Sequence, residues 1–433
     1  MQTAFTQEQM AEPGISIAND ILRKCVHCGF CTATCPTYIL TGNELDSPRG
    51  RIYLFRDMLE ADRTPSAATV KHTDRCLSCL SCMTTCPASV DYMHLVDETR
   101  NRIEKNYARP FSDQLLRELL IKVLPNPKIL RLTLLGARFT KLFAPVLPGR
   151  LKSLLQMVPK TIPPASDMDL PQVFPANGPR KMRVALMTGC AQRVLRPSIN
   201  EATIRLLTRY GCEVIVTNGI GCCGALAHHM GKEKNAISSA LANIKAWSDL
   251  STENGEIDAI VINTSGCGTM VKDYSFILRN DPKWAARATW VAKKAKDITE
   301  VFAQLKIQAQ TSEQKTTVVY HSACSMQHGQ KIINQPKTVL ERVGFKVVEP
   351  AEAHLCCGSA GTYNIMQPNF ASQLRSRKIA NLRATGANLV ATGNIGCLQQ
   401  LSSNNGDSFG LVIVHTVELL DWATGGPKPK DIA

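Results

Sequence analysis

The chain has 433 residues, 44% of them hydrophobic and 20% charged, which is enough for about three domains with buried cores. Fifty basic and 36 acidic residues give a net charge of +14, but no nucleic-acid-binding motif accompanies it, so we expect no nucleic acid partner. Seventeen cysteines behind a polar N-terminus indicate metal or redox sites in a reducing cytoplasm, and no run of 18 apolar residues predicts a transmembrane helix.

Two copies of one cysteine pattern lie between residues 25 and 87. Each copy reads C-x2-C-x2-C-x3-C-P, the spacing with which bacterial-type ferredoxins hold 4Fe–4S clusters. Three closely spaced thiolates reach one cluster, and the fourth cysteine of each run ligates the other cluster. Two zinc sites with four cysteines each are the weaker alternative. The predicted ligands are Cys25, Cys28, Cys31 and Cys86 for the first cluster, and Cys35, Cys76, Cys79 and Cys82 for the second.

Helices separate and flank the two runs. Apolar periodicity predicts helices at about 15–23 and 92–106, and a third at 48–60 with Ser47 as its N-cap and Pro48 in its first turn. The pattern indicates an α-helical ferredoxin domain over residues 1–110. Arg49 and Arg51 either donate hydrogen bonds to the cluster sulfurs or lie on a solvated helix face.

Residues 111–181 differ in composition from their surroundings. Between 111 and 160, nine basic residues accompany two acidic ones, and leucines recur at helical spacing between prolines. Such basic amphipathic helices bind an anionic membrane surface or a partner, or simply pack on the protein with their charges solvated. Residues 161–181 are rich in Pro and Ala and predict a linker.

The remaining chain is an internal repeat, with modules at 182–310 and 311–433. In each module one cysteine precedes a Cys-Cys-Gly sequence by 32 residues, and a Gly-Cys pair follows. Apolar β-branched segments at 183–187, 214–216 and 259–262, and at 318–320, 346–348 and 389–391, alternate with helical segments and predict parallel sheets. Every cysteine site follows a predicted strand, at the sheet edge where α/β proteins bind ligands.

Four thiols therefore converge in each module. They suit a further iron–sulfur cluster, a zinc ion or, less well, a redox-active thiol pair, unless the site is empty. The candidate ligands are Cys190, Cys222, Cys223 and Cys267 in the first module, and Cys324, Cys356, Cys357 and Cys397 in the second. His228, His229, His321 and His354 are nearby candidates for ligands or proton donors, although a single histidine is more often structural. Cys212 has no counterpart and is expected to be a buried core thiol.

These motifs resemble the iron–sulfur subunits built on the plan of heterodisulfide reductases, and more closely the family of iron–sulfur subunits of bacterial glycolate oxidase. The resemblance lies in CVHCGFCTATCPTYILTGNELDSPRGRIYL (25–54), the second cysteine run, SGCGTMVKDY (265–274) and HLCCGSAGTY (354–363). The wider superfamily often ends each module in C-x-x-C, whereas Thr264 and Asn394 occupy the first of those positions here. This departure argues against a catalytic cluster of the heterodisulfide-reductase type.

The resemblance implies a subunit that works with flavoprotein partners and passes electrons from glycolate, through flavin in those partners and its own two clusters, to the membrane quinone pool. It also implies a peripheral position on the cytoplasmic face of the inner membrane. We find no dinucleotide fingerprint, Walker motif or catalytic triad, so no catalytic residue is assigned and the chain alone is not expected to oxidise glycolate. Two alternatives stay open: a heterodisulfide- or quinone-reductase-like catalytic subunit, and the iron–sulfur subunit of a lactate or glycerol-3-phosphate dehydrogenase.

Overall fold

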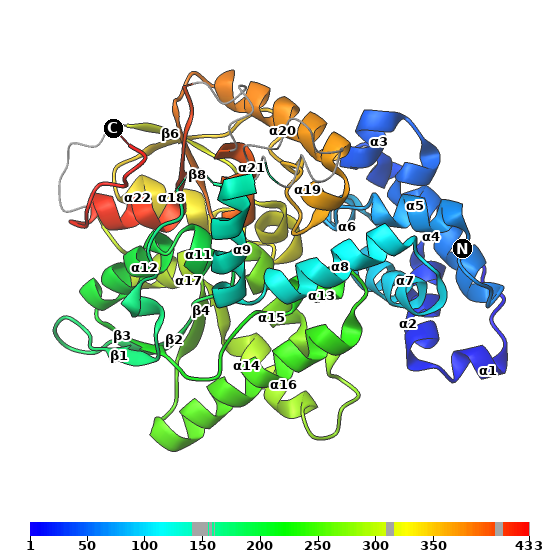
Figure 1. Cartoon of the computed structure of the whole chain (residues 1–433), viewed down its shortest axis with the longest axis horizontal. Coiled ribbons are helices and arrows are strands. Elements are labelled where there is room, and N and C mark those ends of the chain that lie inside the picture. The colour runs from blue at the N-terminus through cyan, green and yellow to red at the C-terminus, as the bar shows by residue number, and fades with distance from the viewer. Residues whose placement is uncertain (141–154, 156–157, 160, 309–315, 403–409, 433) are drawn as a thin grey trace.

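The computed structural model describes residues 1–140, 155, 158–159, 161–308, 316–402 and 410–432. An α-helical N-terminal region stands at one end of the molecule, and two α/β modules form the other end (Figure 1). The fold class predicted from the sequence is confirmed. Several basic residues of the 111–160 segment, Lys141, Arg150, Lys152 and Lys160, lie outside the described residues.

The N-terminal region consists of short helices around the two cysteine runs. The predicted helix at 48–60 is confirmed, and the Ser47 side chain accepts a hydrogen bond from the Gly50 N–H as its N-cap. The prolines that close the cysteine runs leave the loops in different ways, since Pro36 begins a helix and Pro87 lies in a turn. The helices are α1 (Gln7–Met10), α2 (Pro13–Lys24), α3 (Pro36–Thr41), α4 (Pro48–Glu60), α5 (Ala67–Asp74), α6 (Ser81–Thr85) and α7 (Tyr92–Asn106).

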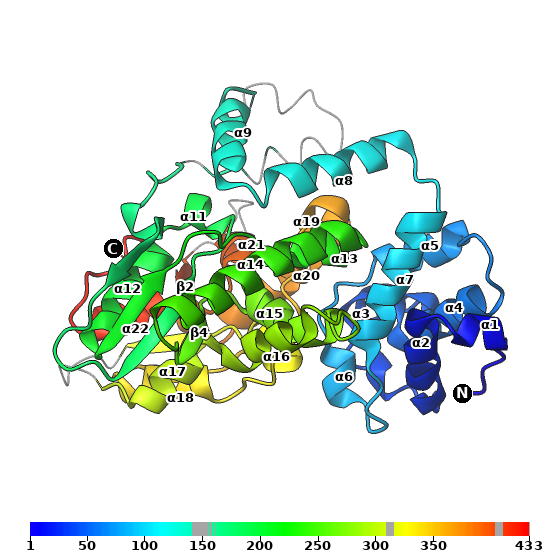
Figure 2. The same ribbon diagram turned by 90° about the horizontal axis from the view of Figure 1, so that it is seen from below.

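Two helices, α8 (Phe111–Val123) and α9 (Pro127–Thr140), cross one side of the molecule and connect its two ends (Figure 2). Leu120 and Ile121 of α8 pack against Met230 and Met366 of the modules, and Leu130 of α9 packs against Val194, so each helix buries one face on the body of the protein. The stretch predicted as a linker, 161–181, contains a short strand, β1 (Gln172–Phe174). This strand escaped prediction because it has only three residues between prolines.

Both modules have the same parallel sheet. The strand order is β1-β3-β2-β4-β5 in the first and β7-β6-β8-β9 in the second, so four parallel strands repeat and only β1 is antiparallel. All six predicted strands are confirmed, and β5 and β9 add a fourth parallel strand to each module. The strands are β2 (Met182–Met187), β3 (Cys212–Val216), β4 (Ala259–Ile262), β5 (Ala295–Asp297), β6 (Thr317–Tyr320), β7 (Lys346–Val348), β8 (Leu389–Thr392) and β9 (Val412–His415).

Helices cover both faces of each sheet. The first module has α11 (Gln192–Leu195), α12 (Ser198–Arg209), α13 (Ala225–His229), α14 (Glu233–Asn254), α15 (Ser265–Ile277), α16 (Ala285–Lys294) and α17 (Ile298–Leu305). The second has α18 (Gln335–Arg342), α19 (Tyr363–Met366), α20 (Pro368–Arg383), α21 (Ile395–Ser402) and α22 (Thr416–Ala423).

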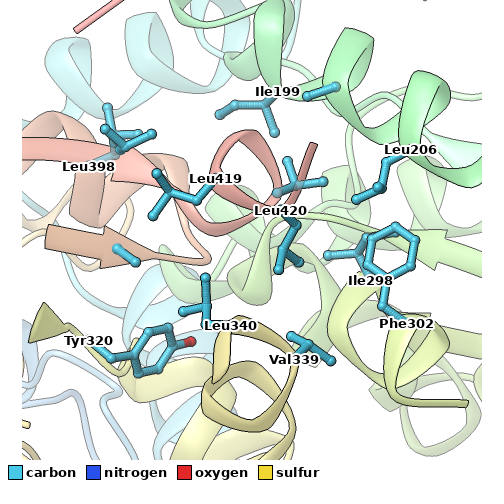
Figure 3. Packing of buried hydrophobic residues seen from close by; sticks show 14 of the residues in the cluster. Ile199, Leu206, Ile298, Phe302, Tyr320, Val339, Leu340, Leu398, Leu419 and Leu420 are labelled. Atoms are coloured by element: carbon cyan, nitrogen blue, oxygen red, sulfur yellow. The ribbon is translucent and has the colours of Figure 1, made fainter. Parts of the chain in front are cut away.

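One hydrophobic core runs through both modules. Ile199 of α12 and Phe302 of α17, from the first module, belong to the same buried cluster as Leu340 of α18 and Leu420 of α22, from the second (Figure 3). Cys212 lies in this cluster with no exposed surface, which confirms that it is a core thiol. The shared core fixes the two cysteine-bearing sheet edges relative to each other.

Candidate functional site

The eight cysteines of the two front runs surround two adjoining pockets. Cys25, Cys28, Cys31 and Cys86 line the first pocket, and Cys35, Cys76, Cys79 and Cys82 line the second. The fourth cysteine of each run therefore lies with the first three cysteines of the other run. Pro48, Cys82 and Tyr92 line both pockets, so a single layer of side chains separates them.

The two cysteine loops have the same unusual backbone. His27 and Gly29 in the first loop have φ values of 56° and 85°, and Ser78 and Leu80 in the second have 50° and 62°. A leucine in the left-handed region costs about 1–2 kcal/mol, so the loop is held in this shape by its surroundings. At Gly29 a Cβ would lie 2.7 Å from Arg49 Nη1, which a movement of the flexible arginine side chain can relieve, so it is the positive φ that favours glycine there.

Of the two roles considered for Arg49 and Arg51, Arg51 donates a hydrogen bond to a cysteine sulfur and does not lie on a solvated helix face. Its guanidinium is 1% exposed and donates to His72 O (2.6 Å), Thr37 Oγ1 (3.0 Å) and Cys35 Sγ (3.9 Å). It also pairs with Asp46 at 3.6 Å. The guanidinium therefore places a buried positive charge beside the sulfur of a predicted ligand.

Arg49 lies at the rim of the first pocket instead. Its Nε donates to Glu44 Oε1 at 2.7 Å, and its side chain is 35% exposed. Because this cation is solvated and already paired, it contributes less charge to the pocket than Arg51 does.

The electrostatics and spacing of the front cysteines fit iron–sulfur clusters. Burial raises the pKa of the Cys79 and Cys82 thiols well above the usual range, and burial also raises the pKa of Cys31 to about 11. Such thiols become thiolates only beside strong positive charge, which a metal centre supplies. A single tetrahedral zinc ion holds its sulfur ligands about 3.8 Å apart. Within the described part of the chain, no three front sulfurs all lie within 4.8 Å of one another, and the preference for iron–sulfur clusters over zinc rests on the sequence pattern.

The cysteines of the first module meet at the carboxyl edge of its sheet. Cys190 follows β2, Cys222 and Cys223 follow β3, and Cys267 lies in the first turn of α15, after β4. Hydrogen bonds from the thiols of Cys190 and Cys223 lower the pKa of Cys222. Asn243 donates to Cys222 O at 2.9 Å, which fixes the Cys-Cys backbone. Thus the predicted set is brought together.

In the second module a histidine lies close to two of the equivalent sulfurs. Cys324 Sγ and Cys356 Sγ are 3.7 Å apart. The ligand atoms of His321, Cys357 and Cys397 all lie within 4.8 Å of one another, and they form the one such group of three or more His, Cys, Asp or Glu among the residues that the structure describes. Burial lowers the pKa of His321 to about 3. The neutral imidazole is the form that binds metal ions.

The second front pocket abuts the second module. Cys79 and Leu77 share a small apolar cluster with Cys356 and Tyr363, and the Tyr363 hydroxyl donates to Arg75 O at 3.1 Å. The two front pockets and the sulfurs of the second module are therefore in consecutive contact.

The other three candidate histidines belong to no such group of close ligand atoms among the described residues. His228 Nε2 is 3.2 Å and His229 Nδ1 3.6 Å from carboxylate oxygens of Asp97 on α7, so both rings serve the interface between the N-terminal region and the first module. The His354 ring is half-buried, and its backbone carbonyl accepts a hydrogen bond from His328 Nε2 at 3.1 Å.

Three functional residues escaped sequence reasoning. Arg100 donates to Cys76 O (2.7 Å) and Ser78 Oγ (2.5 Å) and so supports the second cysteine loop. His94 joins α7 to Asp273 of the first module, and Lys378 is buried beside the sulfurs of the second. Comparing the two repeats would have flagged Lys378, because Asn243 stands at the corresponding place in the first module.

The outer faces of α8 and α9 expose large apolar side chains next to basic ones. The exposed stripe on α8 is Phe111, Leu115, Leu119 and Lys122, and that on α9 is Lys128, Ile129, Leu132, Leu135 and Arg138. We call these residues the α8–α9 ridge.

The acidic residues of α8 do not neutralise this ridge. Asp113 pairs with Arg109 and Arg117, and Glu118 pairs with Lys232, whereas the ridge cations have no ion pair with another described residue. None of the helices in the described ranges is long and apolar enough to cross a bilayer.

Comparison with known proteins agrees with this site. A 4Fe-4S dicluster domain model matches residues 24–90, and a Cysteine-rich domain model matches residues 184–272 and 318–402. A solved structure, described as a hypothetical protein from Helicobacter pylori, aligns with 99% of this chain and 74% of its own at a TM-score of 0.58 and 10% identity, which concerns the fold alone.

Several curated proteins are similar in sequence. Lactate utilization protein A of Bacillus subtilis is 27% identical and covers 55% of this chain and 99% of its own length. The probable glycolate oxidase iron-sulfur subunit of Bacillus subtilis is 31% identical over 93% of this chain and 94% of its own. The glycolate oxidase iron-sulfur subunit of Escherichia coli K12 is 38% identical over 98% of this chain and 99% of its own. The chain belongs to the family of glycolate oxidase iron–sulfur subunits.

Proposed function

We propose that the chain is the electron-transfer subunit of a glycolate dehydrogenase complex. In this proposal Cys25, Cys28, Cys31 and Cys86 hold a first 4Fe–4S cluster, and Cys35, Cys76, Cys79 and Cys82 hold a second. Such clusters, when bound, supply one-electron redox chemistry. The observation that carries the proposal is the pair of adjoining pockets, each lined by all four cysteines of one set, with Cys82 lining both.

The chain's own residues set the direction of the relay. Cys28 is exposed, and Val26 (69% exposed) and Phe30 (61%) present apolar surface beside it. We place the contact with the flavoprotein partner here, because apolar surface around an exposed ligand lets another redox protein approach the first pocket closely. The second pocket is buried, and Arg51 there stabilises negative charge on Cys35.

The ligand assignment is tested by removing one cysteine at a time. Cys86→Ser is expected to lose about four irons per chain from the set that contains Cys25, although residue 86 belongs to the second run. Cys35→Ser should do the reverse. The measurement is iron and sulfide content with electron paramagnetic resonance of the reduced protein. Cys212→Ser, a buried cysteine outside all sets, is the control, and an unchanged cluster signal in Cys86→Ser contradicts the assignment.

The function is tested with the native complex. The purified subunit should show cluster absorbance but no glycolate oxidation, and activity should appear when the flavoprotein partners are added with a quinone acceptor. Running D-lactate beside glycolate in the same assay distinguishes the lactate alternative. Glycolate turnover by the subunit alone contradicts the proposal.

We also propose that the α8–α9 ridge binds the cytoplasmic face of the membrane, near the quinone pool. Its cations suit anionic lipid, worth about 1 kcal/mol for each Lys or Arg near the surface, while its exposed leucines suit the interface. Leu115→Glu with Leu132→Glu should reduce flotation with anionic lipid vesicles. Ile333→Glu changes an equally exposed apolar residue away from the ridge and should have no effect. If binding to vesicles is lost only when the flavoprotein is present, the ridge contacts the flavoprotein instead of the membrane.

We propose the same four-part division as the sequence predicts, at 110, 181 and 310. The separate sheets of the two modules support the division near 310, whereas β1, which lies before residue 181, pairs with β3 in the sheet of the first module.

A further inference from the structure

The two modules differ at the position three residues before their first cysteine. The first has Met187 there, three residues before Cys190, and the second has His321, three residues before Cys324. The His321 backbone N–H donates to Ala391 O at 2.9 Å, which extends the β6–β8 pairing by one residue. This places the histidine at the carboxyl edge of the sheet, where the cysteines gather.

The His321 side chain has no partner of its own. It is 1% exposed, and neither ring nitrogen has a hydrogen-bond partner. A buried polar group left unpaired costs about 1–3 kcal/mol, so such a ring is rare without a ligand. Its nearest candidate partners are the sulfurs of Cys357 and Cys397, with which its ring lies within 4.8 Å.

The spacing of these three ligand atoms suits one metal ion. Zinc binds sulfur at about 2.3 Å and imidazole nitrogen at about 2.0–2.1 Å, so the ligands of one tetrahedral ion lie about 3.3–3.8 Å from one another. Sulfurs that each hold a separate iron of a cubane stand further apart, as the front cysteines do. Cys356 precedes Cys357 directly in the chain, and its sulfur is 3.7 Å from that of Cys324, so this pair offers a fourth ligand.

A buried lysine lies near these cysteines. Lys378 is 1% exposed, and its Nζ donates to the Glu352 backbone carbonyl at 2.7 Å. Burial lowers the pKa of Lys378, and negative charge on Cys357 and Cys356 acts in the opposite direction. In the first module the neutral residue Asn243 occupies the equivalent position. Ala236 packs on Gly224 there, as Ala371 packs on Gly358 in the second module. Asn243 lies seven residues after Ala236, and Lys378 lies seven residues after Ala371.

We propose that the second module binds one zinc ion through His321, Cys357 and Cys397, with the fourth ligand from the Cys324–Cys356 pair. Because zinc has no redox chemistry, the ion would be structural. It would join the loops after β6, β7 and β8 and hold Cys356 against Cys79 of the second front pocket. This site goes beyond the proposed electron transfer and does not depend on it.

The test compares metal content in four forms of the full chain, purified anaerobically, equilibrated with Zn²⁺ and desalted. Wild type should contain about one zinc per chain more than His321→Ala, with the same iron content in both. Met187→Ala, the matched change in the first module, should retain the wild-type zinc. His321→Cys should also retain it, because a thiolate replaces the imidazole, and Co²⁺ bound in its place should show an altered visible spectrum that reports the exchange of nitrogen for sulfur.

The outcomes separate clearly. Equal zinc in wild type and His321→Ala overturns the proposal, and so does a loss of zinc from His321→Cys when that variant keeps its iron. Retained iron shows that a variant is folded. If the wild type binds no iron but the zinc difference persists, the electron-transfer proposal fails while the zinc site stands.

Discussion

His94 on α7 forms a pH-dependent contact between the N-terminal region and the first module. Its Nδ1 is 2.6 Å from Asp91 Oδ2, its Nε2 is 2.9 Å from Asp273 Oδ1, and its ring stacks on Phe276 with the centroids 3.4 Å apart. Burial lowers the pKa of this imidazole, but hydrogen bonds and charge from Asp273 and Asp91 outweigh burial and raise the pKa to about 9.

The sign of the effect follows from the raised pKa. The unfolded value is about 6.5, so the stabilisation is fully present below pH 6.5 and is lost as the pH rises through 9. With these two values, linkage gives about 2.5 kcal/mol at pH 7 and about 0.4 kcal/mol at pH 9. Burial raises the pKa of Asp273, and the hydrogen bond and charge of His94 act in the opposite direction.

Replacing His94 by glutamine should remove this pH dependence. The measurement is the thermal unfolding midpoint under anaerobic conditions at pH 7, 8, 9 and 10. The difference between wild type and His94→Gln should shrink by about 2.5 kcal/mol across the series, or about 5–10 °C for a unit of 150–250 residues. Phe276→Leu removes the ring stack but keeps the charge pair, so it should retain the pH dependence. Parallel curves for wild type and His94→Gln would refute the reasoning.

Three further predictions concern stability. Arg51→Met should lower the free energy of unfolding by about 2–4 kcal/mol. This loss is smaller than the cost of leaving Asp46 as an isolated buried charge, because Asp46 retains other partners. Arg49→Met at the exposed rim should change the free energy of unfolding by under about 1 kcal/mol, and urea denaturation checks both variants. Gly358→Ala puts a Cβ 2.6 Å from the Ala371 carbonyl and should cost about 2–4 kcal/mol, while Gly386→Ala, with the same positive φ but open space, should cost about 1 kcal/mol. Phe302→Ala in the shared core should cost about 3–5 kcal/mol and reduce the midpoint of both modules together.

Short-range patterns account for what the sequence predicts well. The position of Cys86 beside the first run and of Cys35 beside the second agrees with the local spacing, which keeps the fourth thiol of each run from its own cluster. The central strands are apolar and β-branched, so β2, β4, β6 and β8 were evident. By contrast, β5 reads Ala-Lys-Asp and alternates buried with exposed positions over only three residues, so its strand state depends on pairing with β4.

Long-range packing accounts for what the sequence does not predict. His94 and Asp273 are 179 residues apart, and nothing local marks either one. The four candidate histidines could not be ranked from sequence, because only the β6–β8 register brings His321 to Cys397 while α13 turns His228 towards α7. The exposed stripes of α8 and α9 follow from periodicity, but which face packs on the modules depends on Met230 and Met366.

The core shared by the two modules has a consequence for biosynthesis. Ser198, at the start of α12, bonds to Glu418 of α22 across 220 residues of chain, and the neighbouring apolar face of α12 packs against the same helix. During translation the first module therefore exposes an apolar surface, which stays uncovered until α22 emerges from the ribosome. Chaperone binding during translation should be strongest in that interval, and a polypeptide cut between the repeats should aggregate rather than yield two independent halves.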